Sequence, residues 1–152
     1  MLEPTSPIIV PMSEHDVDAV HALARECFRV AWDRHVFEEE LARDWAYLRV
    51  LRPSPAEPVS AFLSFWLVRD EIHVLNVGTH PSVRRRGYAR LLMHDMLGFA
   101  RSRGVRYVSL EVRRSNGAAL RLYTTLGFDP IGIRPGYYAD DGEDAVVMLL
   151  TL

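Results

Sequence analysis

The sequence predicts an α+β fold, a sheet with helices packed on it, and three observations predict it. Segments with apolar residues at strand spacing follow one another in the first half of the chain. A segment with helical spacing, residues 87–103, then lies between two further strand segments, an order typical of a strand–helix–strand unit with parallel strands. A length of 152 residues with 49% hydrophobic residues suits one domain with a full core, so we expect no boundary within residues 1–152.

The N-terminal half is expected to hold two helices and an antiparallel meander. Ser13, which is followed by acidic residues, suits the N-cap of a helix that ends near Cys27. A shorter helix is expected over residues 34–43, with Trp32 in the connection before it. The segment 52–58 contains three prolines and is typical of a hairpin loop. The expected strands cover residues 8–10, 47–51, 59–68 and 72–79.

The C-terminal half begins with the helix over residues 87–103. Leu92, Met93 and Met96 recur there at helical spacing, and Gly104 is a stop signal. The elements expected after it are a strand over residues 107–112, a helix over residues 116–126 ended by Gly127, a strand marked by Ile131 and Ile133, and a final strand over residues 145–150 that follows a turn at Asp141-Gly142.

Composition and charge exclude several classes of function. The net charge of -2 provides no field that would attract nucleic acid or an anionic membrane, so neither is expected as a partner. A single cysteine cannot form an internal disulfide, which suits a reducing compartment, and cytoplasm is the simplest interpretation. Residues 1–12 contain no basic residue, unlike a signal peptide, and the longest apolar stretch, residues 61–68, is too short to span a bilayer. For the oligomeric state, a monomer is the default.

No metal is expected. The six histidines have no spacing typical of a metal site, and the motif H-E-x-x-H does not occur. The single cysteine, Cys27, lies on the apolar stripe of a predicted helix, so we expect a buried structural thiol and not a nucleophile.

A basic turn with the sequence Arg84-Arg85-Arg86-Gly87-Tyr88-Ala89 lies between a predicted strand and the start of the longest helix. Unpaired arginines at a helix N-terminus oppose the helix dipole, each by about 0.3 to 1 kcal/mol. A bound anion removes this conflict, since free backbone N–H groups, a glycine and guanidinium groups together form a cradle for pyrophosphate. A solvated basic turn is the alternative. The glycine spacing G-x-G-x-x-G of a dinucleotide-binding unit is absent.

Through Arg84, Gly87 and Ala89 this turn resembles the acetyl-CoA pyrophosphate signature Q/R-x-x-G-x-G/A of the GNAT acetyltransferase superfamily. The sequence from about residue 75 to residue 148 is similar to the RimI family of ribosomal-protein alanine N-acetyltransferases, and residues 28–37 are weakly similar. The motifs that carry this similarity are Leu110-Glu111-Val112-Arg113-Arg114-Ser115-Asn116, Ala118-Ala119, Leu122-Tyr123, Leu126-Gly127-Phe128, Gly136-Tyr137-Tyr138, Gly142-Glu143-Asp144-Ala145 and Met148. The resemblance implies the GNAT fold, a mixed sheet of about seven strands with about four helices, in which two parallel strands splay apart at the cofactor site.

The resemblance implies acetyl-CoA as co-substrate. Its pyrophosphate is expected on the basic turn, at Arg84, Arg85, Arg86, Gly87, Tyr88 and Ala89. The family grips the acetyl group and the pantetheine arm with main-chain groups of Val77, Gly78 and Thr79, beside a strand bulge. Since Gly78 stands where these proteins often have Ala, it is expected to loosen the strand by up to about 1 kcal/mol. Asn116, a suitable helix N-cap by its own chemistry, is implied to donate a hydrogen bond to CoA.

The resemblance also implies the catalytic residues. Glu111 is implied to accept the proton of the attacking amine, through water, as general base. From its residue type alone, a surface glutamate paired with Arg113 or Arg106 is the alternative. Tyr123 resembles the general acid that protonates the departing CoA sulfur, and a phenol with an ordinary pKa near 10 carries a proton at neutral pH. Since Tyr123 lies on the apolar face of its helix, a simple core tyrosine is the alternative.

On the acceptor side, Tyr137 and Tyr138 precede an acidic segment that contains Asp140, Asp141, Glu143 and Asp144. A hairpin with solvated charges is one interpretation. The resemblance implies another, a wall whose tyrosines hold a peptide backbone while the carboxylates attract a basic N-terminal segment. Trp32 is the candidate for the opposite wall.

The implied reaction is direct acetyl transfer in a ternary complex to the α-amine of a protein N-terminus, with a small-subunit ribosomal protein that begins with alanine as the expected acceptor. An enzyme of the same family that acetylates a lysine or a small-molecule amine is one alternative. A non-catalytic acyl-CoA-binding module is another, and binding alone requires neither Glu111 nor Tyr123.

Overall fold

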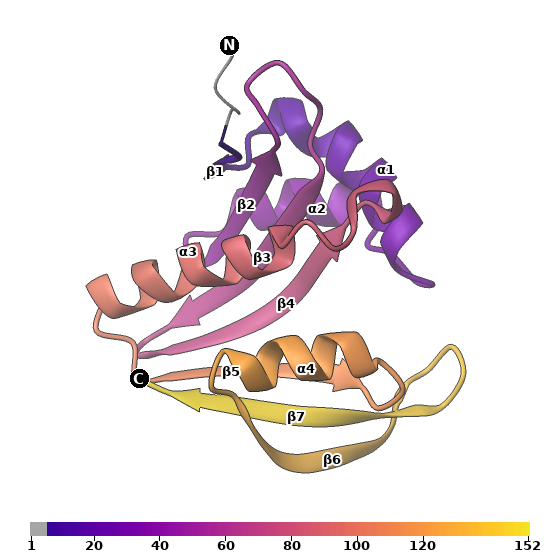
Figure 1. Cartoon of the computed structure of the whole chain (residues 1–152), viewed down its shortest axis with the longest axis vertical. Coiled ribbons are helices and arrows are strands. Elements are labelled where there is room, and N and C mark those ends of the chain that lie inside the picture. Colours follow the sequence, from indigo (N-terminus) through magenta and orange to yellow (C-terminus); the bar gives the residue numbers. More distant parts are fainter. Residues whose placement is uncertain (1–5) are drawn as a thin grey trace.

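One seven-stranded mixed sheet runs through the chain in the order β1-β2-β3-β4-β5-β7-β6. Figure 1 shows this sheet in the computed structural model, which describes residues 6–152. Residues 1–5, part of the segment that is unlike a signal peptide, lie outside the described residues. Within the described part, no helix is long and apolar enough to span a bilayer.

All the predicted helices and strands are present. The strands are β1 (Ile8–Pro11), β2 (Ala46–Arg52), β3 (Ala61–Val68), β4 (Glu71–Thr79), β5 (Tyr107–Arg113), β6 (Asp129–Tyr138) and β7 (Glu143–Thr151). The helices are α1 (Val17–Cys27), α2 (Arg34–Leu41), α3 (Tyr88–Ser102) and α4 (Gly117–Thr125), with short 3-10 turns at Glu14–Asp16 and Pro81–Val83. The prediction for α2 was two residues too long, because the N–H groups of Ala42 and Arg43 form tighter bonds to the carbonyls three residues earlier.

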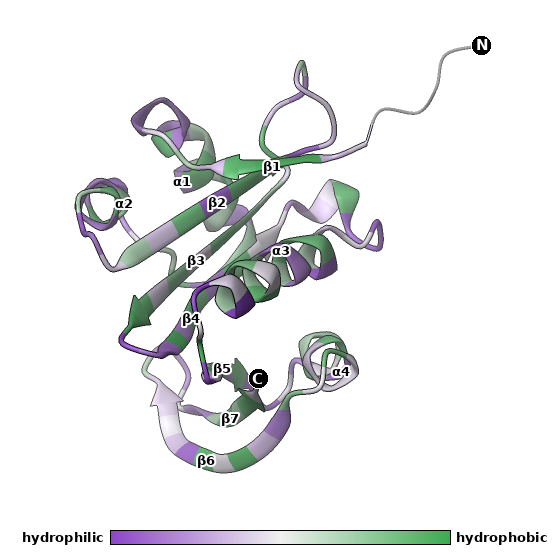
Figure 2. Ribbon diagram, turned by 90° about the vertical axis from the view of Figure 1, so that its left-hand side faces the viewer, coloured by the Kyte–Doolittle hydropathy of each residue, from purple (hydrophilic) through white to green (hydrophobic). Residues whose placement is uncertain are grey.

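The helices cover both faces of the sheet. Figure 2 shows α1 and α2 on one face and α3 and α4 on the other. The larger core cluster lies under α3 and α4, and the smaller one lies under α1 and α2. The fully buried side chains Leu92, Met93 and Met96 of the larger cluster are those whose helical spacing the sequence shows.

β4 and β5 are parallel, as the strand–helix–strand order predicts, but they pair only over their first three residues, from Glu71↔Tyr107 to His73↔Ser109. A bulge at Leu75 interrupts the ladder between β4 and β3 just beyond this point. Figure 1 shows the two strands diverging from there. The expectation of splayed parallel strands is thus confirmed, and the β4 main chain at Val77–Thr79 has no strand partner on its β5 side.

Gly78, which was expected to loosen β4, lies where a side chain would be crowded. A methyl group at Gly78 would lie 2.8 Å from Cε1 of Phe62, 3.3 Å from Sγ of Cys27 and 3.4 Å from Cε2 of Phe28. The end of α1 therefore packs on β4 at a distance that only glycine allows. The Cys27 thiol, half-buried at this contact, donates a hydrogen bond to the Thr79 carbonyl, and burial raises its pKa, in agreement with a structural role.

Gly78→Ala is expected to lower the free energy of unfolding by about 1 to 3 kcal/mol, because the core must shift to accept one methyl group. Gly98→Ala is the matched control, since within residues 6–152 no atom outside the adjacent helix backbone lies within 4 Å of the position of its methyl group. In the middle of α3 that change is expected to stabilise the protein by up to about 1 kcal/mol. Urea melts of both variants measure the two effects. A Gly78→Ala protein as stable as the unmodified one would contradict the packing argument.

Candidate functional site

The basic turn connects the end of β4 to the start of α3. Arg85 has φ 70° and Gly87 has φ 79°, so two left-handed residues frame Arg86. For an arginine such a backbone costs about 1 kcal/mol or more, and a strained backbone of this kind concentrates at functional sites. Within α3 the first hydrogen bond runs from the Leu91 N–H to the Gly87 carbonyl, which leaves the earlier N–H groups without a helical partner.

The three arginines of this turn are exposed, and none of them pairs with a carboxylate within residues 6–152. Tyr88 differs from its neighbours because its side chain is buried in the larger core cluster. Only its backbone N–H is therefore available to a ligand. The turn as a whole presents unpaired N–H groups and unpaired guanidinium groups together, which is the chemistry of an anion cradle.

Asn116 is the N-cap of α4, as predicted. Its side-chain oxygen accepts a hydrogen bond of 3.1 Å from the Ala119 N–H. The amide nitrogen of the same side chain has no hydrogen-bond partner in the described part of the chain. Since α3 follows β4 and α4 follows β5, both helices begin at the edge of the sheet where the two strands have separated. Asn116 and the basic turn thus flank the same opening.

Glu111 lies on β5 and points away from α3 and α4, because its neighbours Leu110 and Val112 occupy the core on that side. Its side chain is only 9% exposed, and its Oε2 lies 2.6 Å from Nε2 of His73. This hydrogen bond is the main reason why the pKa of Glu111 is lowered, and the charge of Arg134 lowers it further. The site therefore holds a nearly buried carboxylate in its ionised form.

The alternative partners that sequence reasoning offered for Glu111 are wrong. Arg106 lies 3.8 Å from a carboxylate oxygen of Asp70. Arg113 pairs with Asp140 and Asp141 of the turn between β6 and β7 and with Glu143, the first residue of β7. Sequence reasoning also missed His73, because the histidines were considered only as metal ligands. The β4–β5 register contains the signal, since His73 lies opposite Ser109 and so shares a face with the residue two positions later, Glu111. The described residues contain no group of three or more His, Cys, Asp or Glu side chains that could hold a metal.

Tyr123 belongs both to the core and to this site. Its ring is 9% exposed and packs against Phe128, with ring centroids 5.9 Å apart. Burial, together with the nearby phenol of Tyr138, raises its pKa to about 12. Its hydroxyl has no hydrogen-bond partner among residues 6–152 and is not completely enclosed. Tyr123 is therefore a protonated phenol whose hydroxyl donor is unoccupied within the described residues.

Tyr138 ends β6 and comes close to both proposed catalytic groups. Burial raises its pKa to about 12, and the charge of Glu111 contributes to the rise. The guanidinium carbon of Arg113 lies 4.0 Å from the centre of its ring. Tyr137 meets Tyr138 edge to face and is exposed. Tyr138 of β6 thus has both Glu111 of β5 and Tyr123 of α4 among its ionisable neighbours.

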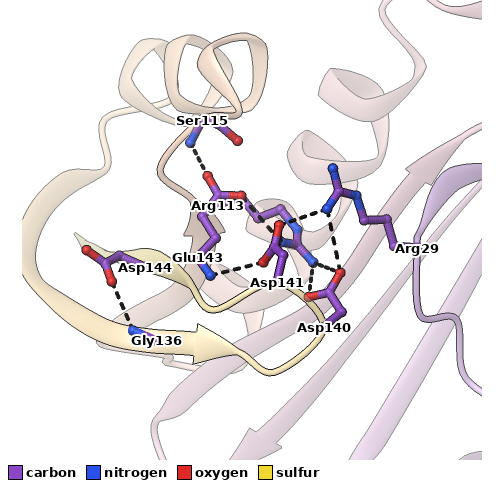
Figure 3. Close-up of polar contacts among 8 residues, drawn as sticks. All are labelled: Arg29, Arg113, Ser115, Gly136, Asp140, Asp141, Glu143 and Asp144. Atoms are coloured by element: carbon purple, nitrogen blue, oxygen red, sulfur yellow. Dashed lines mark hydrogen bonds and ion pairs between the residues drawn. The ribbon is translucent and has the colours of Figure 1, made fainter.

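The acidic residues after Tyr138 pair with arginines, although Asp140 and Asp141 are exposed. Figure 3 shows Arg113 bonded to Asp140 at 2.9 Å, to Asp141 at 3.1 Å and to Glu143 at 3.3 Å. Although burial opposes its charge, these hydrogen bonds raise the pKa of Arg113. Glu143, the first residue of β7, also accepts a hydrogen bond from the Ser115 N–H and so supports the segment before α4.

A second arginine links this acidic turn to the other side of the sheet. Arg29, in the connection between α1 and α2, donates to Asp141 at 2.8 Å. Trp32 lies in the same connection, half-buried, and its ring packs against Phe37 of α2 at 5.4 Å. The segment that carries Trp32 and the turn that follows Tyr138 are therefore joined by an ion pair.

Comparisons with known proteins agree with this architecture. Residues 17–128 match the model of the acetyltransferase (GNAT) family. The ribosomal protein bS18-alanine N-acetyltransferase of Salmonella typhimurium is 31% identical over 143 residues, which cover 93% of this chain and 95% of the relative. The crystal structure of the ribosomal-protein-S18-alanine N-acetyltransferase from Escherichia coli has a TM-score of 0.87 at 30% identity and covers 95% of this chain and 93% of that chain.

A more distant structure, Arabidopsis thaliana NAA60 in complex with acetyl-CoA, has a TM-score of 0.85 at 17% identity and covers 97% of this chain and 99% of that chain. At this identity the likeness concerns the fold alone. Together these matches confirm the fold and the family resemblance that the sequence motifs indicate.

Proposed function

Since the chain belongs to the GNAT family of acetyltransferases and is an acetyl-CoA-dependent N-acetyltransferase, we propose that its acceptor is the α-amine of a protein N-terminus. A ribosomal protein that begins with alanine is the acceptor we propose, because relatives named for that reaction match more than nine tenths of the chain. The observation that carries the proposal is the ionised, nearly buried Glu111 beside the opening between β4 and β5. We also propose that the protein acts in the cytoplasm and that residues 1–152 form a single catalytic domain.

Acetyl-CoA is proposed to bind in this opening. The strained turn of Arg85 and Gly87, with unpaired N–H groups at the start of α3, suits its pyrophosphate. The unpaired β4 edge at Val77, Gly78 and Thr79 suits the amide groups of the pantetheine arm, which can extend the sheet there. The unused amide nitrogen of Asn116 is the remaining contact that we propose. Bound in this way, the co-substrate supplies the activated thioester carbonyl.

Arg86→Glu is expected to raise the KM for acetyl-CoA about tenfold or more, because one charge-assisted hydrogen bond contributes roughly 1.5 to 3 kcal/mol and about 1.4 kcal/mol is a factor of ten. Arg101→Glu, an exposed site in the last turn of the same helix, is the charge-matched control. Initial rates at varied acetyl-CoA measure both variants. Equal KM values for the two variants would refute the cradle.

In the proposed reaction, Glu111 accepts one proton from the acceptor ammonium, directly or through water, and passes it to solvent. The neutral amine then attacks the thioester carbonyl, the bond from that carbonyl to sulfur breaks, and the second proton lost by the nitrogen goes to water or to the departed thiolate. A phenol with a pKa of about 12 is a weak acid toward a thiolate whose conjugate acid has a pKa near 8.5. Tyr123 is therefore proposed to donate a hydrogen bond to the sulfur as its negative charge develops, and complete proton transfer is not required.

The acceptor peptide is proposed to lie between Tyr137 and Tyr138 on one side and the connection that carries Trp32 on the other. The three carboxylates bound by Arg113 exceed their two arginine partners, Arg113 and Arg29, by one negative charge. Attraction of a basic acceptor segment is therefore weaker than the acidic sequence suggests. The tyrosine rings are proposed to contribute more to binding than the charges do.

The test is the release of CoA from acetyl-CoA with a short basic peptide that begins with alanine, compared with the same peptide whose α-amine is blocked. Turnover with the free terminus alone supports the proposal. Turnover with the blocked peptide that contains a lysine indicates a lysine acetyltransferase. Acetyl-CoA binding without turnover on any amine indicates a binding module and refutes the proposed function.

A further inference from the structure

The two carboxylate oxygens of Glu111 have different partners. Oε2 lies 2.6 Å from Nε2 of His73, within hydrogen-bond distance. Oε1 lies 3.6 Å from a guanidinium nitrogen of Arg134, beyond hydrogen-bond distance, and the Arg134 side chain is 59% exposed. One oxygen is therefore held by a neighbouring strand, and the other has room for a proton.

His73 must be the donor in this contact. An ionised carboxylate only accepts hydrogen bonds, and the ordinary pKa of a glutamate, about 4.3, already leaves it ionised at neutral pH. Nε2 of His73 therefore carries a hydrogen that points to Oε2. The contact acts in one direction, from the imidazole to the carboxylate.

The contact lies at the fork between β4 and β5. His73 and Ser109 form the last ladder pair of the two strands, and the next residue on the same face of β5 is Glu111. Beyond this pair the two strands are no longer paired. The hydrogen bond between the side chains of His73 and Glu111 thus connects β4 to β5 two residues beyond the last paired residue of β5.

Other ionisable groups face this pair from each packed element. Arg134 and Tyr138 approach Glu111 from β6. On β4 itself, Glu71 lies on the same face as His73. Tyr107 of β5 is the register partner of Glu71. On the β3 side, the register partner Trp66 donates its indole N–H to the buried Glu40 of α2, which also pairs with Arg43. Among these groups Glu111 alone hydrogen-bonds to His73 within the described part of the chain.

We propose that His73 is a positioning residue, which fixes Oε2 of Glu111 and leaves Oε1 as the oxygen that accepts the proton of the acceptor amine. The inference rests on the proposed function and extends it to a residue outside the family motifs in this sequence. Without this bond the nearly buried carboxylate can rotate, and burial then favours its protonated form.

The test compares His73→Phe, which removes the donor, with His73→Gln, which keeps an N–H donor but cannot titrate. The carboxyl pKa of Glu111 is measured by carbon-13 NMR, with Glu111→Gln used to assign the signal. We expect His73→Phe to raise this pKa, since a hydrogen bond to the charged form is lost. Initial rates are expected to show a kcat about tenfold lower or more with an unchanged KM for acetyl-CoA. His73→Gln is expected to bring both the Glu111 pKa and kcat most of the way back to their values in the unmodified protein.

An unchanged Glu111 pKa in His73→Phe, or equal loss of kcat in the Phe and Gln variants, would overturn the proposal. Circular dichroism and thermal melts show whether His73→Phe folds, and the NMR titration of His73→Gln supplies the test if it does not. The titration requires no substrate. A protein that acetylates no N-terminus but shows the shifted pKa would refute the proposed function and leave the His73 contact established.

Discussion

Glu111→Gln is expected to lower kcat/KM for N-terminal acetylation by about 10²- to 10⁴-fold, the usual contribution of a general base. Glutamine has the same shape and can still accept the hydrogen bond from His73, so the position of the side chain is retained. What is lost is the ability of Oε1 to take up a proton. Initial rates with an alanine-led peptide measure the effect.

Two further measurements distinguish loss of the base from loss of structure. Affinity for acetyl-CoA is expected to stay within about twofold, because Glu111 is not among the groups proposed to bind it. Since a group with a lowered folded-state pKa stabilises the fold only above its unfolded pKa, near 4.5 for Glu111, the stabilising effect is lost as the pH falls through the folded value. The melting temperature of Glu111→Gln is therefore expected to approach that of the unmodified protein at acid pH. Unchanged kcat/KM in this variant would exclude Glu111 as the base.

Tyr123→Phe is expected to lower kcat about 10- to 100-fold, less than loss of the base, because a thiolate leaves more readily than most groups without a proton. The KM for acetyl-CoA is expected to change little. No hydrogen bond within the described chain is lost, and the ring still fills its place against Phe128. The melting temperature is therefore expected to remain within a few degrees of the original.

Tyr138→Phe is the matched comparison for this variant, since burial raises the pKa of both phenols to about 12. Its expected effect is on the KM for the peptide, because Tyr138 is proposed to line the acceptor side. If Tyr123→Phe turns over as fast as the unmodified protein, or if the two variants raise the peptide KM alike, Tyr123 does not assist departure of the thiolate.

The sequence was sufficient to predict the secondary structure and the basic turn, because these depend on residues close together in the chain. The spacing of Met93 and Met96 predicts the buried face of α3. Asn116 caps α4 with its side-chain oxygen, as expected for an asparagine N-cap. Family motifs added the splayed strands, which the register of β4 and β5 confirms. The catalytic and binding roles of Glu111 and Tyr123 remain proposals that the experiments above address.

What the sequence did not predict depends on residues far apart in the chain. His73 and Glu111 are 38 positions apart, and Arg29 and Asp141 are 112 positions apart, so their contacts arise only when the strands and the connecting segments take their register. The same applies to Gly78, whose need for glycine comes from α1 packing against β4. Periodicity and capping thus determine the elements of this protein and their order. Tertiary packing decides the ionisation of its central carboxylate, because burial and a hydrogen bond from another strand act on that group only in the folded chain.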